Sequence, residues 1–184
     1  MSATSELRRD HEVIMKVLTA MDVLRTILRQ GKELPLEVIN DTIDFAKNFT
    51  DRCHHGKEED VLFPALNAAG MPNDEGPIAV MLREHKQGRE ILARIEDALS
   101  RYKHGSSSID EVIVGIEGYI TLMQHHIFKE NNILFNIADM MLGSKSSELS
   151  KGYEKIEHEV MHDKHGHYEH MAESIIERIN AIKK

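Results

Sequence analysis

The feature that most constrains the fold is a helical spacing of apolar residues along nearly the whole chain. In the first thirty residues apolar side chains return every three or four positions, at Leu7, Ile14, Leu18, Met21, Leu24 and Leu28. This spacing puts them on one face of an α-helix, whereas a half-buried strand alternates apolar and polar residues. No sustained alternation of that kind occurs in the sequence. The pattern therefore predicts an all-α protein.

Clusters of glycine, proline and serine divide the pattern into five predicted helices. Their ranges are about 5–30, 35–70, 78–103, 108–142 and 148–182. Four long amphipathic helices joined by short polar loops predict an up-down-up-down four-helix bundle over residues 1–143. Residues 144–184 are expected to add a His-rich C-terminal helix that packs on the bundle as part of the same domain. Because this helix could instead swap onto a partner chain, a homodimer is one expected state.

Charge and composition argue against several classes of partner. The chain has 23 Lys and Arg residues against 31 Asp and Glu residues, a formal net charge of −8, and no basic cluster suited to nucleic acid. No apolar run approaches the roughly 20 residues of a membrane span, and the first residues lack the apolar segment of a secretion signal. The single Cys53 fits a reducing compartment. We therefore expect a cytoplasmic protein without a nucleic-acid or membrane partner.

Histidines on the apolar helix faces are the main anomaly, because the cores of helical bundles are usually aliphatic. On the fourth predicted helix, His126 and Glu130 both lie on the apolar face, one turn apart. This spacing lets an imidazole and a carboxylate reach one metal ion from the same helix. His11 and His85 occupy comparable positions on the first and third helices.

The second helix offers two candidate pairs, His54 with Glu58 and His55 with Glu59. The ten residues from His54 repeat, without a gap, the pattern that begins at the histidine of the fourth helix, including its Lys and Leu-Phe. At 3.6 residues per turn His54 also shares the face of Ile43, whereas His55 is turned well away from it. The sequence therefore favours His54 and Glu58, with the neighbouring pair as the alternative.

Together these residues predict a metal centre. A single histidine on a core face is more often a hydrogen-bonded core residue than a ligand, but here four helices each contribute one and two of them add a glutamate. Buried carboxylates are costly unless cations compensate them. Imidazole and carboxylate ligands on facing helices suit iron, with manganese or zinc as alternatives.

The motifs that carry these residues resemble the hemerythrin-like, HHE cation-binding family. They are Asp10-His11-Glu12, HHGKEEDVLFP from His54 to Pro64, REHKQGRE around His85 and HHIFKENNILF around His126. The resemblance covers roughly residues 5–142 and implies an up-down four-helix bundle that holds two oxo- or hydroxo-bridged irons, with bridging carboxylates and terminal histidines. Carried over residue by residue, the implied ligands are His11, His54, Glu58, His85, His126 and Glu130.

Two departures from the oxygen-carrying members of that family narrow the expected function. Those members have HxxxH on the third helix, where this chain has His85-Lys-Gln-Gly-Arg89, and HxxxxD on the fourth, where it has HxxxE. The pattern is closer to the branch that resembles di-iron proteins of nitrosative-stress defence and iron–sulfur repair, although the Cys-containing N-terminal segment of the repair proteins is not recognisable.

The expected function is a non-haem di-iron protein that binds or reacts with O2, NO or peroxide in stress protection or sensing, served by an electron donor. The alternatives are a non-catalytic module that stores iron or binds metal or oxygen, and a structural zinc or manganese site. Whether the chain is an enzyme stays open.

The C-terminal helix adds one more candidate ligand. Five histidines lie between residues 157 and 170, and His167 falls on the apolar stripe defined by Tyr153, Val160 and Met171. We hypothesise that His167 closes the iron site in place of the histidine that the third helix lacks. The alternative is that all five form a hydrated surface.

Overall fold

The computed structural model describes residues 2–32, 36–105, 108–161 and 165–183. Within them every regular element is a helix and no strand occurs, which confirms the all-α class. The predicted helix-ending glycines Gly31 and Gly70 both have a positive φ, at 70° and 105°. None of the described helices is both long and apolar enough to cross a membrane.

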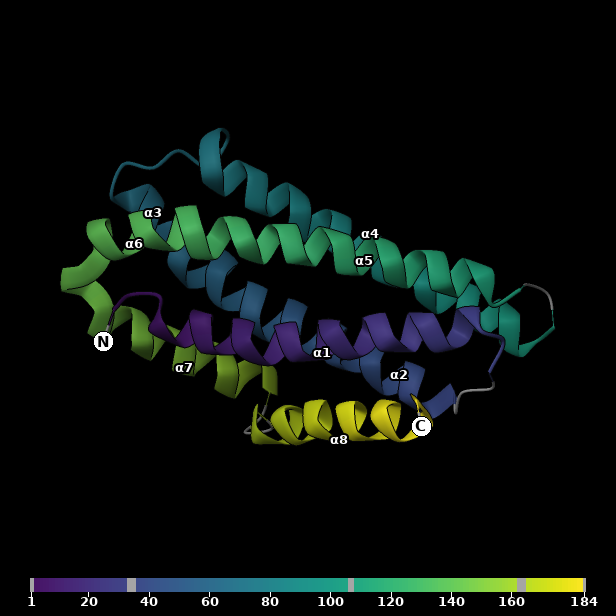
Figure 1. Cartoon of the computed structure of the whole chain (residues 1–184). Coiled ribbons are helices and arrows are strands. Elements are labelled where there is room, and N and C mark those ends of the chain that lie inside the picture. The colour runs from purple at the N-terminus through teal and green to yellow at the C-terminus, as the bar shows by residue number, and fades with distance from the viewer. Residues whose placement is uncertain (1, 33–35, 106–107, 162–164, 184) are drawn as a thin grey trace.

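Four long helical stretches run beside one another along the molecule (Figure 1). The first is α1 (Ser5–Arg29), and the third is α4 (Gly76–Lys103). The second and fourth stretches are each built from consecutive segments. They are α2 (Leu36–Phe45), η1 (Ala46–His55), η2 (Glu58–Leu62) and α3 (Phe63–Ala68), and then α5 (Asp110–Lys129), η3 (Glu130–Leu134) and α6 (Phe135–Leu142). Helix α5 packs against both α1 and α4, and η1 packs against α1 and α4.

Three of these segments, η1, η2 and η3, wind as π-helix rather than α-helix. A π-helix joins residues five apart, so it turns through a smaller angle per residue, and π segments within helices are frequent at functional sites. Here η1 ends at His55, η2 begins at Glu58 and η3 begins at Glu130. The loosely wound segments therefore coincide with both histidine–glutamate motifs.

The apolar core consists of two clusters, with polar residues between them. One cluster includes Ile14, Cys53 and Ile91, and the other includes Leu7 and Leu62. Along each of the four stretches, the buried histidines and carboxylates lie where one cluster gives way to the other. The polar layer thus crosses the bundle at one level, enclosed by apolar packing at both ends.

The C-terminal part forms two helices where the sequence suggested one. A short 3-10 turn, η4 (Gly143–Lys145), leads into α7 (Ser146–Met161), and α8 (His165–Lys183) follows, while residues 162–164 lie outside the described part. Helix α7 packs on η1 and η2, whereas α8 lies along α1 and α2 (Figure 1). The two helices therefore cover different parts of the bundle.

Candidate metal centre

Seven residues meet in the polar layer, and each is at most 2% exposed. They come from all four helical stretches: His11 from α1, His54 and His55 from η1, Glu58 from η2, His85 from α4, His126 from α5 and Glu130 from η3. Apolar neighbours close the layer on both sides; Phe135, for example, stacks on His11 with 5.2 Å between ring centroids. The cluster is therefore screened from bulk water.

The seven residues divide into two groups, each able to surround one metal ion. In each group the candidate ligand atoms lie within 4.8 Å of one another. One group is His11, His54, Glu58 and Glu130, and the other is His55, Glu58, His85 and His126. Glu58 belongs to both, so the geometry offers two adjacent cation positions with a shared carboxylate.

Both carboxylates reach across the two groups. Glu58 places Oε1 3.7 Å from His54 Nε2 and Oε2 3.3 Å from His85 Nε2. Oε2 of Glu130 lies 3.1 Å from His11 Nε2 and 3.3 Å from His126 Nε2. Each carboxylate therefore faces one histidine of each group, which is the arrangement expected of bridging ligands.

The hydrogen bonding of the cluster supports a metal. Nine buried polar atoms of the described residues have no hydrogen-bond partner, and all nine belong to this cluster: the five histidine Nε2 atoms and the four oxygens of Glu58 and Glu130. An unsatisfied buried polar group costs about 1–3 kcal/mol. Because all nine atoms are potential metal ligands on adjacent residues, bound cations account for them together.

In each of the five histidines of the cluster, the second ring nitrogen, Nδ1, forms a hydrogen bond with a residue outside the two ligand groups. The Nδ1 pairs are His11 with Asn131 (3.0 Å), His54 with Asp10 (3.3 Å), His55 with Asp51 (3.2 Å), His85 with Glu59 (2.7 Å) and His126 with Glu84 (3.0 Å). An Nδ1–H that donates to an outer oxygen leaves Nε2 with its lone pair free for a metal, and such partners fix ring orientation and raise ligand basicity.

Four of these outer contacts form a closed cycle around the bundle. Asp10 on the first stretch holds a ring of the second, and Glu59 on the second holds a ring of the third. Glu84 on the third holds a ring of the fourth, and Asn131 on the fourth holds the ring of the first. Each outer residue is also the sequence neighbour of a candidate ligand. Each of the four long stretches thus supplies at least one candidate ligand and orients a candidate ligand of another stretch.

Cations stand behind the outer carboxylates. Lys57 donates to Asp10 at 3.0 Å, Arg89 contacts both Asp51 (2.8 Å) and Glu59 (2.6 Å), and Lys129 pairs with Glu84. Burial alone would raise the pKa of Glu84, but hydrogen bonds from His126 and Lys129 outweigh it and lower this pKa to about 2. These cations favour the ionised form of the outer carboxylates, although at Asp51 burial outweighs Arg89 and leaves the pKa above its usual value.

Electrostatics within the cluster keeps Glu130 ionised and His55 neutral, whereas Glu58 and Glu59 outweigh burial and raise the pKa of His85 to about 9, so that a metal ion must displace a proton from that ring. Burial would raise the pKa of Glu130, but the nearby His126 and His11 lower it to about 2, which keeps the carboxylate ionised. Burial, reinforced by His85 and His126, lowers the pKa of His55 well below its usual value and keeps that ring neutral. Ionised carboxylates and neutral imidazoles are the forms that bind metals.

The comparison with known families agrees with this geometry. Residues 2–138 match the model of the hemerythrin HHE cation-binding domain. The chain belongs to this family. No solved structure matches the chain.

The chain is also similar to several curated bacterial proteins. It is 23% identical over 159 residues to an uncharacterized protein of Mycobacterium tuberculosis, covering 85% of this chain and 62% of the relative. It is 35% identical over 85 residues to the iron-sulfur cluster repair protein YtfE of Musicola paradisiaca, covering 45% and 38%. A probable iron-sulfur cluster repair protein of Haemophilus influenzae is 27% identical over 131 residues, covering 69% and 57%. The chain thus spans less than two thirds of each of these relatives.

Six of the residues predicted from the sequence are brought together in this hemerythrin-like site. They are His11, His54, Glu58, His85, His126 and Glu130. That each of them binds metal stays a prediction. The sequence analysis did not predict that Asp10, Glu59, Glu84 and Asn131 orient the histidines, although their position next to a candidate ligand in the sequence was an available signal.

The structure corrects the expectation for His55. The α-helical period of 3.6 residues per turn predicts that this ring points away from the core. Because η1 is a π-helix, with a smaller rotation per residue, both His54 and His55 face inward. The ring of His55 stacks on that of His85, with 3.8 Å between centroids. Of the alternative pair His55 and Glu59, only His55 belongs to a ligand group. Glu59 lies outside both groups and forms a hydrogen bond with Nδ1 of His85.

The structure does not bring His167 to the cluster. Its side chain is exposed on α8 and contacts the ring of Tyr168 rather than the cluster. The reason is that α8 turns Ala172, Ile175 and Ile179 toward the bundle, which leaves His167 facing solvent. His158 and His170 are exposed as well, and the side chains of His162 and His165 lie outside the described part. The fifth imidazole of the cluster is that of His55.

Proposed function

We propose that this hemerythrin-family chain holds two iron ions, bridged by Glu58 and Glu130, and binds or reacts with O2, NO or peroxide in stress protection or sensing. The observation that carries the proposal is the pair of candidate ligand groups that share Glu58. All nine buried side-chain atoms without a hydrogen-bond partner among the described residues belong to these two groups or to the glutamates between them. Five imidazoles and two carboxylates form a donor set suited to iron. The printed names of two relatives, iron-sulfur cluster repair proteins, support a role in iron-related stress.

In this proposal the four long stretches form an up-down-up-down bundle over residues 1–143, and residues 144–184 belong to the same domain. Bound irons would supply Lewis acidity and one-electron redox chemistry. The chain excludes water from the layer, holds each ring by its Nδ1 and bridges the two positions. His11 and His54 provide two imidazoles on one side, against three from His55, His85 and His126 on the other. We place the small ligand on the two-histidine side, where the protein supplies fewer nitrogen donors.

Metal analysis of aerobically purified protein tests the iron proposal. We expect about two irons per chain, near-ultraviolet charge-transfer bands of an oxo-bridged ferric pair, and a change in these bands on stopped-flow mixing with NO or peroxide. Stoichiometric zinc or manganese without such bands would contradict it. Bands that change with NO or peroxide but without turnover would identify a binding or sensing module.

The substitution Glu58→Gln tests the shared carboxylate. It keeps the size of the side chain but removes the charge common to both groups, so both ions should be lost or bound far more weakly. Glu154→Gln on α7 is the matched control, because Glu154 is exposed and should leave the metal content unchanged. Loss of only one ion in Glu58→Gln would argue against a bridging role.

A further inference from the structure

Lys57 is buried inside the bundle beside the candidate ligand Glu58, and its side chain is 1% exposed. A buried ammonium is very costly unless it is paired. Its Nζ contacts Asp10 Oδ2 at 3.0 Å and also pairs with Glu157 Oε1. The side chain is therefore a cation clamped between two carboxylates.

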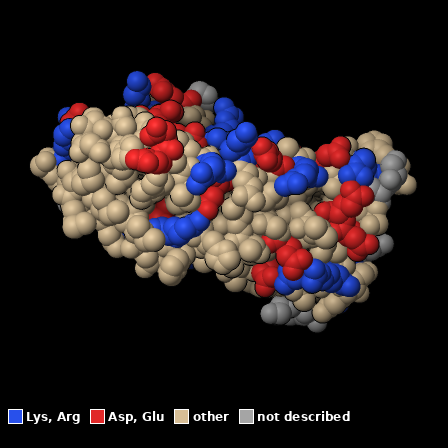
Figure 2. Space-filling model, turned by 90° about the horizontal axis from the view of Figure 1, so that it is seen from above, with Lys and Arg blue, Asp and Glu red and all other residues tan. Residues whose placement is uncertain are grey.

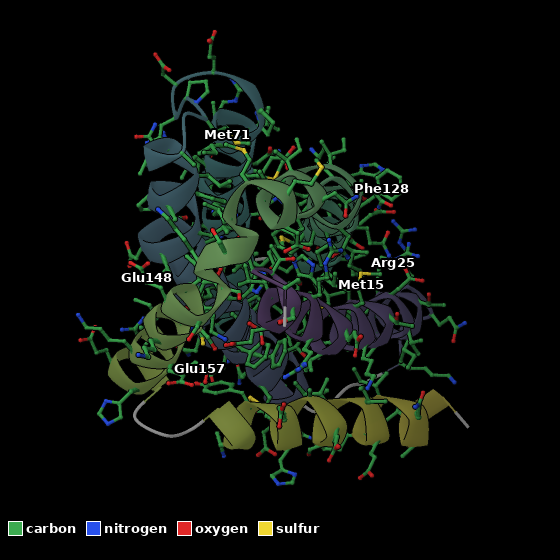
Figure 3. The ribbon with its side chains drawn as sticks, turned by 90° about the vertical axis from the view of Figure 1, so that its left-hand side faces the viewer. Met15, Arg25, Met71, Phe128, Glu148 and Glu157 are labelled. Atoms are coloured by element: carbon green, nitrogen blue, oxygen red, sulfur yellow. The ribbon has the colours of Figure 1, made fainter. Side chains whose placement is uncertain are left out.

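These contacts join a candidate metal ligand to a helix outside the matched family region. Oδ2 of Asp10 accepts from both His54 Nδ1 (3.3 Å) and Lys57 Nζ. Lys57 in turn reaches Glu157, whose side chain is 30% exposed. The family model ends at residue 138, whereas Glu157 belongs to α7 (Figure 3). A continuous polar path thus runs from His54 to the surface of α7.

Close packing holds Glu157 in position. A Cβ added at Gly152 would lie 2.7 Å from Val61 Cγ1, and one added at Gly56 would lie 3.5 Å from Ile156, the neighbour of Glu157. The hydroxyl of Tyr153 donates to the Ala3 carbonyl at 3.1 Å. Helix α7 is therefore packed closely on the bundle in the two turns that immediately precede Glu157.

The cations behind the other rings differ from Lys57 in exposure. Arg89 and Lys129 have side chains that are 43% and 32% exposed, so water screens their charges. Lys57 has no such screening, and its effect on Asp10 depends on how well Glu157 balances its charge. A change at Glu157 should therefore be felt at His54 more strongly than a comparable surface change elsewhere on α7.

We propose that Glu157 is a positioning residue of the metal centre: it balances Lys57, and through Lys57 and Asp10 it sets how strongly His54 binds the ion that it shares with His11. The inference rests on the proposed metal-binding function and adds α7 to the machinery that tunes it.

The sign of the effect follows from the charges. Without the negative charge of Glu157, Lys57 draws more strongly on Asp10, which then accepts less strongly from the Nδ1–H of His54. The imidazole becomes a poorer donor, and the environment of the ion gains net positive charge. Both changes weaken binding and favour the ferrous state, so the midpoint potential of that ion rises. Removing the charge of Lys57 has the opposite electrostatic effect and lowers the potential.

The test compares Glu157→Gln, Lys57→Gln and a control, Glu159→Gln, in the full chain. Glu159 lies on the same helix, and its Oε1 is 3.7 Å from Lys155 Nζ at the surface. Its substitution therefore removes one negative charge from α7 without touching Lys57. Chelator competition measures the affinity of each ion, and spectroelectrochemical titration measures the midpoint potentials. Glu157→Gln should weaken one ion only, by less than the roughly 10–100-fold typical when a direct partner of a ligand is lost. Its potential should rise, that of Lys57→Gln should fall, and Glu159→Gln should match the parent.

Two results would overturn the inference: Glu157→Gln indistinguishable from the parent, or potentials that move in the same direction in both variants, as general loosening would produce. If Lys57→Gln does not fold, Glu157→Asp replaces it and should restore the parent values. If the parent holds zinc, the iron proposal fails, but chelator competition still decides the inference. If the parent holds no metal, both fail.

Discussion

At the scale of single residues, the direction of one histidine decides how complete the metal centre is. His54 and His55 are adjacent, and on an ideal α-helix only one of them could face the core. The π winding of η1 lets both rings face inward, and Asp51, one contact further out, holds the second ring by its Nδ1. The sequence could place His54 by its repeat and periodicity, but His55 depended on a local winding that no residue pattern revealed.

Substituting His55 with Ala should therefore remove a donor from the three-histidine group. We expect the metal ion of this group to bind more weakly and the charge-transfer spectrum to change, because only two imidazoles then remain in the group. His167→Ala serves as the matched control and should leave metal content and spectrum unchanged, since its ring is exposed. Metal analysis with absorption spectroscopy measures both. An unaffected His55→Ala would show that His55 only packs on His85.

At the scale of elements, the boundaries of the helices followed largely from glycine and proline, whereas their internal winding and packing did not. The predicted 78–103 helix corresponds closely to α4, and the predicted 108–142 helix to α5, η3 and α6. The expected C-terminal helix is instead α7 and α8, which pack on different parts of the bundle. Glycines inside helices occupy two kinds of position: some lie against a side chain of another helix, and others have free space where a Cβ would lie.

Gly152 and Gly118 test this difference as a matched pair of substitutions by Ala. In Gly152→Ala the new Cβ would meet Val61 at 2.7 Å, and overpacking of this kind costs about 1–3 kcal/mol, more than the helix gains by losing a glycine. We expect a net loss of about 1 kcal/mol in the free energy of unfolding. Gly118→Ala meets nothing within 4 Å and should gain roughly 0.5–1 kcal/mol. Denaturant unfolding measures both, and a stabilised Gly152→Ala would contradict the close docking of α7.

At the scale of the whole molecule, a polar layer interrupts an otherwise apolar bundle, and outer hydrogen bonds from all four stretches tie that layer together. The face seen in Figure 2 carries interspersed acidic and basic side chains rather than a patch of one sign. Inside the bundle, the inward-facing atoms of two buried carboxylates and five imidazoles have no hydrogen-bond partner among the described residues, and a bound cation would compensate them.

Removing the metal should accordingly destabilise the entire molecule. A ligand present at about 1,000 times its dissociation constant stabilises by roughly 4 kcal/mol, and 1 kcal/mol corresponds to about 2–4 °C in the Tm of a chain of this size. We expect chelation to lower the Tm by on the order of 10 °C, and metal added back to restore it, with circular dichroism following unfolding. An unchanged Tm in verified metal-free protein would mean that the polar layer is stable by itself.

By itself the sequence determined the helical class, the approximate helix ranges and six of the seven clustered residues, because apolar periodicity and the spacing of side chains on one helix are local properties. The tertiary structure alone decided that His55 faces inward, that His167 does not reach the site, and that Lys57 is clamped by a residue a hundred positions away. These depend on local π winding and on how α7 and α8 dock. Both are settled by packing between segments distant in the chain, which no local pattern encodes.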